Sequence, residues 1–346
     1  MEPMFYLHPP TRDDARPEKV YVEPTTRCNF NCSICFRHGW TDEVPAHMED
    51  RVFHALAEQL RDMPSVREVF FGGMGEPLCH PDILRMVEDL PKNKKVSLLT
   101  NGSLLSPEMS EGLIRAGLAE LWVSMDGFDA SCYEAIQRGG QYEALLKNLE
   151  AFNHARRGTP VRLGVTFVVS RSNLGQLERM NEFADRFAVD ELNLSRMIPG
   201  EPMSQEELLY DREDIPAGKM RRYGLESGIG EENTCPFIIA NSTFVRRDGC
   251  VVPCMQLLHS GYTWLFEERR HITSFSYGNV LDKSLEACWR SADYSAFRHR
   301  VDTFYFPFCR VCWGCEDREK NLVDCILNES PTCGACLWAT GKVFCP

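Results

Sequence analysis

The sequence lacks the features that place proteins in membranes or on nucleic acids. No apolar run approaches the roughly 18 residues that a bilayer-spanning helix needs, and Met1–Arg12 contains no apolar core of a signal peptide. Basic residues are in the minority, because 38 Lys and Arg face 50 Asp and Glu and leave a net charge of −12. We therefore expect a cytoplasmic globular protein that binds neither nucleic acid nor a membrane surface.

Cysteine, by contrast, is abundant and unevenly placed among the 16 positions that it occupies. One group is Cys28, Cys32 and Cys35, and ten cysteines besides Cys288 crowd the region from Cys235 to Cys345. Disulfides would suit a secreted chain, but without a signal peptide the short spacings favour metal sites. The remaining cysteines stand alone and are expected to be small buried hydrophobic residues: Cys79, Cys132 and Cys288.

Hydrophobic periodicity predicts strands that alternate with helices over the first 200 residues. The expected strands cover residues 20–22, 66–71, 96–99, 121–124, 161–169 and 191–197. The expected helices cover residues 52–63, 83–90, 107–117, 142–155 and 174–187. Strands separated by helices of this size predict βαβ units, a parallel sheet and an α/β fold, with fewer strands than the eight of a closed barrel.

The pattern divides the chain into four segments. Residues 1–16 form an expected N-terminal arm, and residues 17–200 form the α/β domain. Residues 201–233 are rich in Gly, Pro and charge and are expected to be a linker. Residues 234–346 carry the crowded cysteines and are expected to form a second domain organised by metal.

The group Cys28-x3-Cys32-x2-Cys35 directly follows the first expected strand. Three thiolates at this spacing can hold three corners of a [4Fe–4S] cluster, because clusters are bound by cysteine sulfur. The fourth iron would then remain open to a substrate or cofactor. The alternative is a zinc site with His38 as a fourth ligand.

Glycine and polar residues follow the next three expected strands. They are the segment Gly72–Pro77, then Thr100-Asn101-Gly102, then Ser124-Met125-Asp126-Gly127. Glycine lets a backbone approach a ligand closely, Glu76 could accept from an ammonium group, and Asn101 or Ser124 could bind a sugar or a carboxylate. Each motif alone is equally consistent with an ordinary turn. Together they converge on one rim of a parallel sheet, which favours a binding site there.

In this order and spacing, these motifs resemble those of the radical S-adenosylmethionine (SAM) enzymes over residues 17–200. The resemblance implies a partial (β/α)6 barrel in which Cys28, Cys32 and Cys35 are the catalytic cluster ligands. The amino and carboxylate groups of SAM would chelate the open iron. One electron would then cleave SAM to methionine and a 5′-deoxyadenosyl radical, which abstracts a hydrogen atom from the substrate.

The resemblance also implies which residues bind SAM. Residues 73–76 would meet the methionine amino group, Asn101 and Ser124 would lie near the ribose or the carboxylate, and the strand containing Val168 would flank adenine. The full expected set is Gly73, Gly75, Glu76, Asn101, Ser124, Asp126 and Val168. One departure from the family is Ile34, where an aromatic residue is frequent.

The C-terminal region resembles the SPASM type of auxiliary-cluster domain. The spacing Cys235-x13-Gly249-x4-Cys254 and the pair Cys309-x2-Cys312 match its pattern, after which the spacing departs from it. The remaining expected ligands are Cys315, Cys325, Cys333, Cys336 and Cys345. We expect two auxiliary [4Fe–4S] clusters, which need eight cysteines in all, with Cys250 as the first spare and no assignment of each ligand. Structural zinc in some of these sites is the alternative.

The segment Cys35–Trp40 resembles the radical SAM maturases associated with tungsten-dependent oxidoreductases. The expected function is therefore a maturase that acts on a cofactor, protein or peptide and takes electrons from a low-potential donor such as ferredoxin or flavodoxin. The alternative is a peptide or protein maturase that forms a thioether or carbon–carbon crosslink or oxidises a side chain. The 27 residues before Cys28 are too few for a fused leader-peptide domain, which weakens that alternative. A non-catalytic iron–sulfur carrier is disfavoured, because a carrier needs no SAM pocket.

Overall fold

The computed structural model of the 346-residue chain describes residues 15–41, 44–198, 200, 233–265, 268–307, 315–325 and 331–339. The expected arm and linker, residues 1–16 and 201–233, fall almost wholly outside these ranges. Within the described part, no helix combines the length and the apolar character that crossing a membrane would require.

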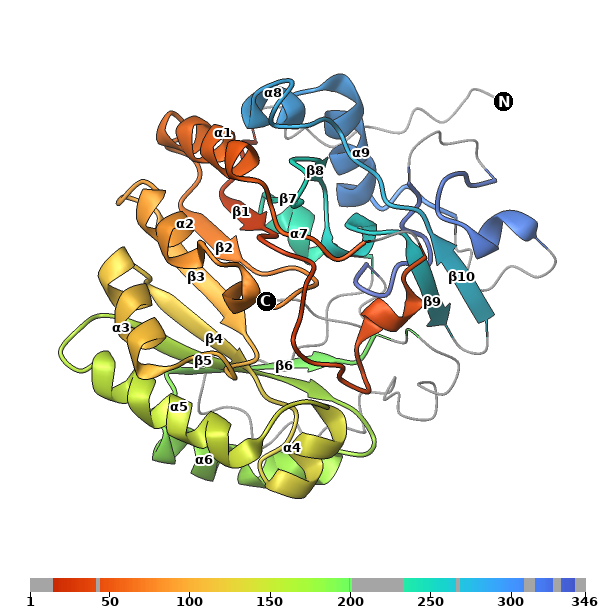
Figure 1. Cartoon of the computed structure of the whole chain (residues 1–346). Helices are drawn as coiled ribbons and strands as arrows, with labels where there is room; N and C mark the ends of the chain where they lie inside the picture. Colours follow the sequence, from red (N-terminus) through yellow and green to blue (C-terminus); the bar gives the residue numbers. More distant parts are fainter. Residues whose placement is uncertain are drawn as a thin grey trace, which may run out of the picture.

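An eight-stranded sheet forms the centre of the structure, with the strand order β6-β5-β4-β3-β2-β1-β7-β8 (Figure 1). Six strands confirm the prediction: β1 (Lys19–Val22), β2 (Glu68–Phe71), β3 (Lys95–Thr100), β4 (Glu120–Ser124), β5 (Arg162–Val169) and β6 (Glu191–Arg196). Each pairs in parallel with its neighbours, so their carboxyl ends share one rim. This arrangement is the predicted parallel α/β fold.

The helices between these strands cover one side of the sheet (Figure 1). They are α1 (Asp50–Arg61), α2 (Ile83–Asp89), α3 (Pro107–Ala116), α4 (Ala130–Ile136), α5 (Tyr142–Ala155) and α6 (Met180–Arg186), with the 3₁₀ turns η1 (Phe36–Gly39), η2 (Pro77–Cys79) and η3 (Leu174–Arg179). Five of the helices match expected ones, although the helix expected over residues 174–187 begins as η3. The sequence did not predict α4, because only Tyr133 and Ile136 of its seven residues are buried and no periodic stripe marks it.

Helix α3 shows how local sequence sets these boundaries. Pro107 occupies its first turn, where a missing N–H costs nothing. The Ser106 hydroxyl accepts from the Met109 N–H at 3.1 Å and satisfies one of the free donors of the helix start. Gly117 ends the helix with φ of 106°, a left-handed conformation that glycine adopts without strain.

The C-terminal region continues the same sheet instead of standing apart. Its elements are α7 (Pro236–Ile239), β7 (Ser242–Val245), β8 (Val251–Val252), η7 (Met255–Leu257), β9 (Gly261–Leu265), β10 (Glu268–Ile272), α8 (Leu285–Trp289), α9 (Ala292–Asp302) and η9 (Glu316–Glu319). Strand β7 pairs in parallel with β1, and the Tyr21 ring stacks on Phe244 at 4.3 Å between centroids. The predicted second region therefore shares the core of the first, a continuity that the sequence did not indicate.

A tight contact between β4 and β5 gives a test of the core. Gly164 is in register with Trp122, and a Cβ atom added at Gly164 would lie 2.4 Å from the indole ring. Because the ring is buried, we expect Gly164→Ala to lower the free energy of unfolding by about 1–3 kcal/mol, as overpacked cores do. Thermal unfolding followed by circular dichroism measures the change.

Gly175→Ala is the matched control, because a Cβ atom there meets nothing within 4 Å. We expect the control to change stability by less than about 0.5 kcal/mol. Equal melting temperatures for Gly164→Ala and the wild type would contradict the packing shown here.

Candidate active site

The loop that carries the three cysteines begins where β1 ends, and two threonines anchor it. The Thr25 hydroxyl donates to the Ala46 carbonyl at 3.0 Å, and the Ala46 N–H donates to the Thr26 hydroxyl at 3.0 Å. Both threonines are buried. These bonds fix the start of the cysteine loop, residues 25–36, above the end of the strand.

Cys28, Cys32 and Cys35 are all half-buried and lie close enough to influence one another. Burial, together with the charge of the neighbouring Cys35, raises the pKa of Cys32 to about 12. The Arg37 Nε donates to the Cys35 sulfur at 3.3 Å, and the Phe30 N–H lies 3.5 Å from the Cys28 sulfur. Sulfur ligands with donors aimed at them suit an iron–sulfur cluster, which supplies the positive charge that keeps thiolates ionised.

The zinc alternative finds no support in this loop. In the described ranges, no three His, Cys, Asp or Glu side chains are gathered tightly enough for a single metal ion. His38, the fourth ligand in that alternative, places its Nε2 2.9 Å from the Asn31 side-chain oxygen. The donor set therefore fits a cluster, whose irons are spread over a larger body, better than one ion.

The glycine loop, residues 72–77 after β2, packs backbone to backbone on the cysteine loop. A Cβ atom at Gly75 would lie 2.3 Å from the Thr25 carbonyl oxygen and 2.6 Å from that of Arg27. The Glu76 N–H donates to the same Arg27 carbonyl at 2.8 Å. Glycine is required at position 75 because any side chain would separate the two loops.

The Glu76 side chain is buried and already joins the ends of two strands. One carboxylate oxygen accepts from the Thr100 hydroxyl at 2.7 Å and from the Leu78 N–H at 3.0 Å, and the other accepts from the Asn101 N–H at 2.7 Å. Burial raises the pKa of Glu76, which these donors partly offset. The carboxylate that was expected to accept from an ammonium group thus also links the ends of β2 and β3.

Asn101 lies at the end of β3 and links it to the cysteine loop. Its side-chain N–H donates to the Asn29 oxygen at 3.0 Å, and its own oxygen accepts from the Ser103 N–H at 2.9 Å. The Asn29 amide in turn donates to the Ser103 hydroxyl at 2.8 Å. Neither Asn29 nor Ser103 was predicted, and only their position beside known motif residues could have suggested them.

Asp126 and Val168 meet across the ends of β4 and β5. The Val168 N–H donates to the Asp126 carboxylate at 2.8 Å, while burial raises the pKa of Asp126 to about 7. Gln137 bonds to both the Asp126 N–H and the Ser124 carbonyl. Ser124 and Val168 keep partly exposed side chains at this rim, whereas Asp126 is buried.

Four thiols of the C-terminal region lie together. Cys235, Cys254 and Cys333 are buried, which raises their pKa values, and the charge of Cys235 raises the pKa of both Cys254 and Cys333 further. Cys336 also belongs to this group. Burial and the charge of Cys336 together raise the pKa of Cys235 to about 12. A small hollow beside them is lined by Cys254, Cys333, Cys336 and Arg270.

The other cysteines are more scattered. The Cys250 sulfur lies 3.7 Å from the Asn279 amide. Burial raises the pKa of Cys250, and the charges that also shift it are those of Asp248 and Arg246. Cys315 is half-buried and Cys325 is exposed. Three expected ligands lie outside the described residues: Cys309, Cys312 and Cys345. No disulfide joins any two of the described cysteines.

The isolated cysteines differ from one another. Cys288 is fully buried, as predicted for a small hydrophobic residue. Cys79 and Cys132 are only half-buried, so the prediction was wrong for these two. The Cys79 thiol lies 3.8 Å from the Asn29 oxygen, and the Cys132 thiol lies 3.7 Å from the Asp126 carbonyl. Both sulfurs therefore contact polar residues of the rim.

Comparison with known proteins identifies the family. The Radical SAM superfamily model matches residues 22–184, and the SPASM model, described as an iron–sulfur cluster-binding domain, matches residues 235–316. The chain is 31% identical to the AdoMet-dependent heme synthase of Methanosarcina barkeri, over 92% of this chain and 96% of the relative. The chain belongs to the radical SAM superfamily. It is therefore a SAM-dependent iron–sulfur enzyme whose SPASM domain binds auxiliary clusters, which confirms the predicted family, enzyme class and cofactors.

Other relatives extend over nearly the whole chain. The tungsten-containing aldehyde ferredoxin oxidoreductase cofactor-modifying protein of Pyrococcus furiosus is 29% identical over 94% of this chain and 96% of its own length. The PqqA peptide cyclase of Gluconobacter oxydans is 25% identical over 92% and 90%. The crystal structure of Streptococcus suis SuiB bound to S-adenosylmethionine covers 86% of this chain and 71% of its own, with a TM-score of 0.62 at 14% identity, and supports the fold.

The contact at Gly75 generates a prediction for this rim. We expect Gly75→Ala to force the glycine loop away from the rigid backbone of residues 25–27, at a cost of about 1–3 kcal/mol in stability. Iron content after anaerobic reconstitution and the melting temperature both measure the effect, and Gly175→Ala again serves as control. Wild-type iron content and stability in Gly75→Ala would show that the two loops are not held in this contact.

Proposed function

We propose that this protein is a radical SAM maturase that modifies a cofactor during the maturation of a tungsten-dependent oxidoreductase. One observation carries the proposal: the similarity to the P. furiosus cofactor-modifying protein extends over 94% of this chain and 96% of that protein, so both regions are shared. The substrate class is therefore a cofactor or the protein that carries it, with a low-potential donor such as ferredoxin or flavodoxin as the electron source. A cytoplasmic location suits such a protein, because free thiols persist there.

The proposed ligands of the SAM-binding cluster are Cys28, Cys32 and Cys35. When bound there, a [4Fe–4S] cluster supplies the electron that cleaves SAM to methionine and a hydrogen-abstracting 5′-deoxyadenosyl radical. Arg37 would stabilise the negative charge on the cysteine sulfurs, because its guanidinium donates to Cys35. These three cysteines would hold three irons of a [4Fe–4S] cluster and would leave the fourth for SAM.

The strand ends would orient SAM. We assign the partly exposed residues Gly73 and Gly75 to its methionine part, with Glu76 near the amino group. Ser124 and Val168 present partly exposed side chains at neighbouring strand ends and would line the ribose and adenine positions. Asn101 and Asp126 hydrogen-bond to other residues of the rim in this structure. We therefore propose that they hold the rim in place.

The four gathered thiols, Cys235, Cys254, Cys333 and Cys336, would hold one auxiliary [4Fe–4S] cluster. Their burial supports this assignment, since buried thiols ionise only where a metal compensates their charge. The second auxiliary cluster would take its ligands from the remaining expected cysteines: Cys309, Cys312, Cys315, Cys325 and Cys345.

A second candidate function is the maturation of a peptide. The observation in its favour is the similarity to the PqqA peptide cyclase over 92% of this chain and 90% of that protein. The two candidates differ in what stimulates SAM cleavage. A tungsten-cofactor-bearing oxidoreductase should accelerate formation of 5′-deoxyadenosine in the first case, and a short precursor peptide should do so in the second.

The first test of the proposed chemistry removes the SAM-binding cluster. After anaerobic reconstitution with SAM and dithionite, we expect the wild type to form 5′-deoxyadenosine, measured by liquid chromatography and mass spectrometry. The variant in which Cys28, Cys32 and Cys35 are all Ala should form none, yet keep about eight of about twelve irons, because each cubane holds four. Cleavage retained in that variant would place the radical chemistry elsewhere.

The second test removes the gathered thiols of the C-terminal region. We expect replacement of Cys333 and Cys336 by Ser to release about four irons per chain, one cluster's worth, while uncoupled SAM cleavage continues. Cys250→Ser is the control and should keep all of its iron, because its sulfur accepts from the Asn279 amide and is not one of the assigned ligands. Unchanged iron in the double variant, or an equal loss in the control, would contradict the assignment.

A further inference from the structure

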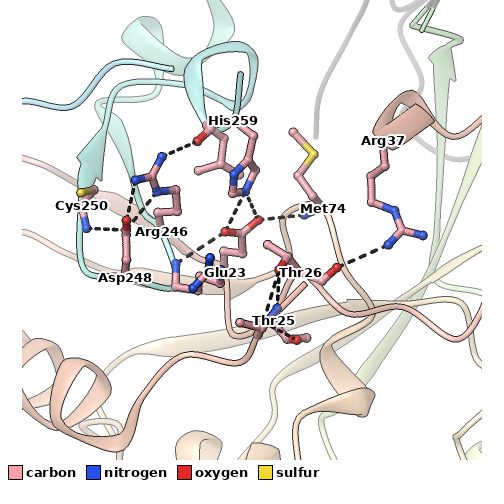
Figure 2. A network of polar contacts seen from close by, with 12 residues as sticks. Glu23, Thr25, Thr26, Arg37, Met74, Arg246, Asp248, Cys250 and His259 are labelled. Atoms are coloured by element: carbon pink, nitrogen blue, oxygen red, sulfur yellow. Dashed lines mark hydrogen bonds and ion pairs between the residues drawn. The ribbon is translucent and has the colours of Figure 1, made fainter. Parts of the chain in front are cut away.

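Glu23, the residue after β1, has a buried carboxylate that joins three parts of the chain (Figure 2). His259 Nε2 lies 2.8 and 3.0 Å from its two oxygens. The Met74 N–H of the glycine loop donates to the same carboxylate at 3.3 Å, and the Arg247 N–H donates to it at 3.5 Å. A side chain of the C-terminal region and a backbone donor of the glycine loop thus meet on one carboxylate.

The shape of the glycine loop also depends on Glu23. A Cβ atom at Gly73 would lie 2.9 Å from the Glu23 Cγ and 3.1 Å from one of its oxygens. Gly73 has φ of 103°, in the left-handed region that glycine favours. The loop therefore rests directly on the Glu23 side chain, and any movement of that side chain would be transmitted to residues 73 and 74.

The same part of the C-terminal region also touches residues 39 and 40, which follow the cysteine loop. The His259 ring packs against the Trp40 ring at 4.8 Å between centroids, and Gly261 forms a backbone bridge with Trp40. A Cβ atom at Gly261 would lie 2.8 Å from the Gly39 carbonyl oxygen. Residues 258–261, the bridging segment, therefore contact both the glycine loop, through Glu23, and the residues that follow the cysteines.

The bridging segment is itself held firmly. The Arg246 guanidinium donates to the Leu258 carbonyl at 3.1 Å and to the Asp248 carboxylate through two nitrogens (Figure 2). Asp248 also accepts from the Cys250 N–H at 3.1 Å. Because a guanidinium–carboxylate pair with two bonds fixes orientation as well as distance, His259 approaches Glu23 from a defined position.

We propose that Glu23 and His259 are positioning residues of the SAM site, through which the C-terminal region holds the glycine loop in its binding conformation. The inference rests on the proposed function, in which residues 73–76 bind the methionine part of SAM. A loop that is ordered before the ligand arrives does not have to be ordered by it, so binding is tighter. SAM affinity, a property of the N-terminal region, thereby depends on a side chain from the C-terminal region.

The test compares variants of His259 that differ in one property. His259→Phe keeps a ring beside Trp40 but removes the donor to Glu23, whereas His259→Gln keeps an amide donor. We expect His259→Phe to weaken SAM binding by roughly ten-fold, the effect of losing one charge-assisted bond, and His259→Gln to restore most of it. Titration of SAM into the reduced protein, followed through the electron paramagnetic resonance signal of the SAM-binding cluster, gives the dissociation constant.

Glu23→Gln supplies an independent variant of nearly the same shape. Its amide nitrogen would face a donor, either His259 Nε2 or the Met74 N–H, so we expect a similar loss of SAM affinity. For a positioning role the KM for SAM should rise, while the rate of 5′-deoxyadenosine formation at saturating SAM stays within about three-fold of wild type.

Gln59→Leu is the matched control, because it removes other bonds between the same two regions. The Gln59 amide donates to the Val280 carbonyl at 2.9 Å and accepts from the Leu285 N–H at 2.7 Å, both on the side of α1. We expect this variant to bind SAM with wild-type affinity. If it weakens binding as much as His259→Phe, the effect is one of general stability and the inference is overturned.

Two further outcomes separate the inference from the function on which it rests. If the wild type forms 5′-deoxyadenosine but Glu23→Gln binds SAM within about two-fold of it, the positioning role is refuted and the function stands. If the wild type neither binds nor cleaves SAM, the proposed function itself fails. Should His259→Phe load no iron, Glu23→Gln decides the matter alone, since its shape is conserved.

Discussion

The position of β1 between β2 and β7 is the constraint on which the whole site depends. Both neighbours pair with it in parallel, in a register that sets Val22 opposite Phe71 on one side and Val245 on the other. The cysteine loop leaves this strand at the point where all three end. It is therefore confined between the glycine loop, which follows β2, and the C-terminal region, which follows β7. The pairing of β1 with β2 and β7 therefore sets the position of the cysteine loop.

Much of this arrangement could be predicted from the sequence, because it depends on patterns of residues close together in the chain. Alternating apolar runs located all six strands, and the cysteine and glycine motifs at their ends located the rim. Parallel strands bring their carboxyl ends together whatever the details of packing. The short helix α4 escaped prediction because it buries little, and the pairing of β7 with β1 escaped because no local pattern records which distant strand will lie alongside.

The finer organisation of the site could not be predicted for a similar reason. The partners of Glu23, Asn29 and Asn101 are fixed by contacts between residues far apart in the chain; Glu23 and His259 are 236 positions apart. Sequence motifs predicted that Glu76 and Asp126 contact a ligand, but they gave no sign that both carboxylates are buried and also accept from backbone N–H groups. The position of a motif indicates where a residue lies. Its hydrogen-bonding partners in the protein decide which of its polar atoms can still bind a ligand.

The parallel pairing of β1 with β7 also bears on how the protein is made. During synthesis β1 emerges early, whereas β7 follows only after roughly 220 further residues. Contacts of such high sequence separation form late. Until then one edge of β1 is open and the bridging segment has not formed. A nascent chain would therefore hold the cysteine loop on one side only. Stable insertion of iron is then best suited to a chain that has already left the ribosome.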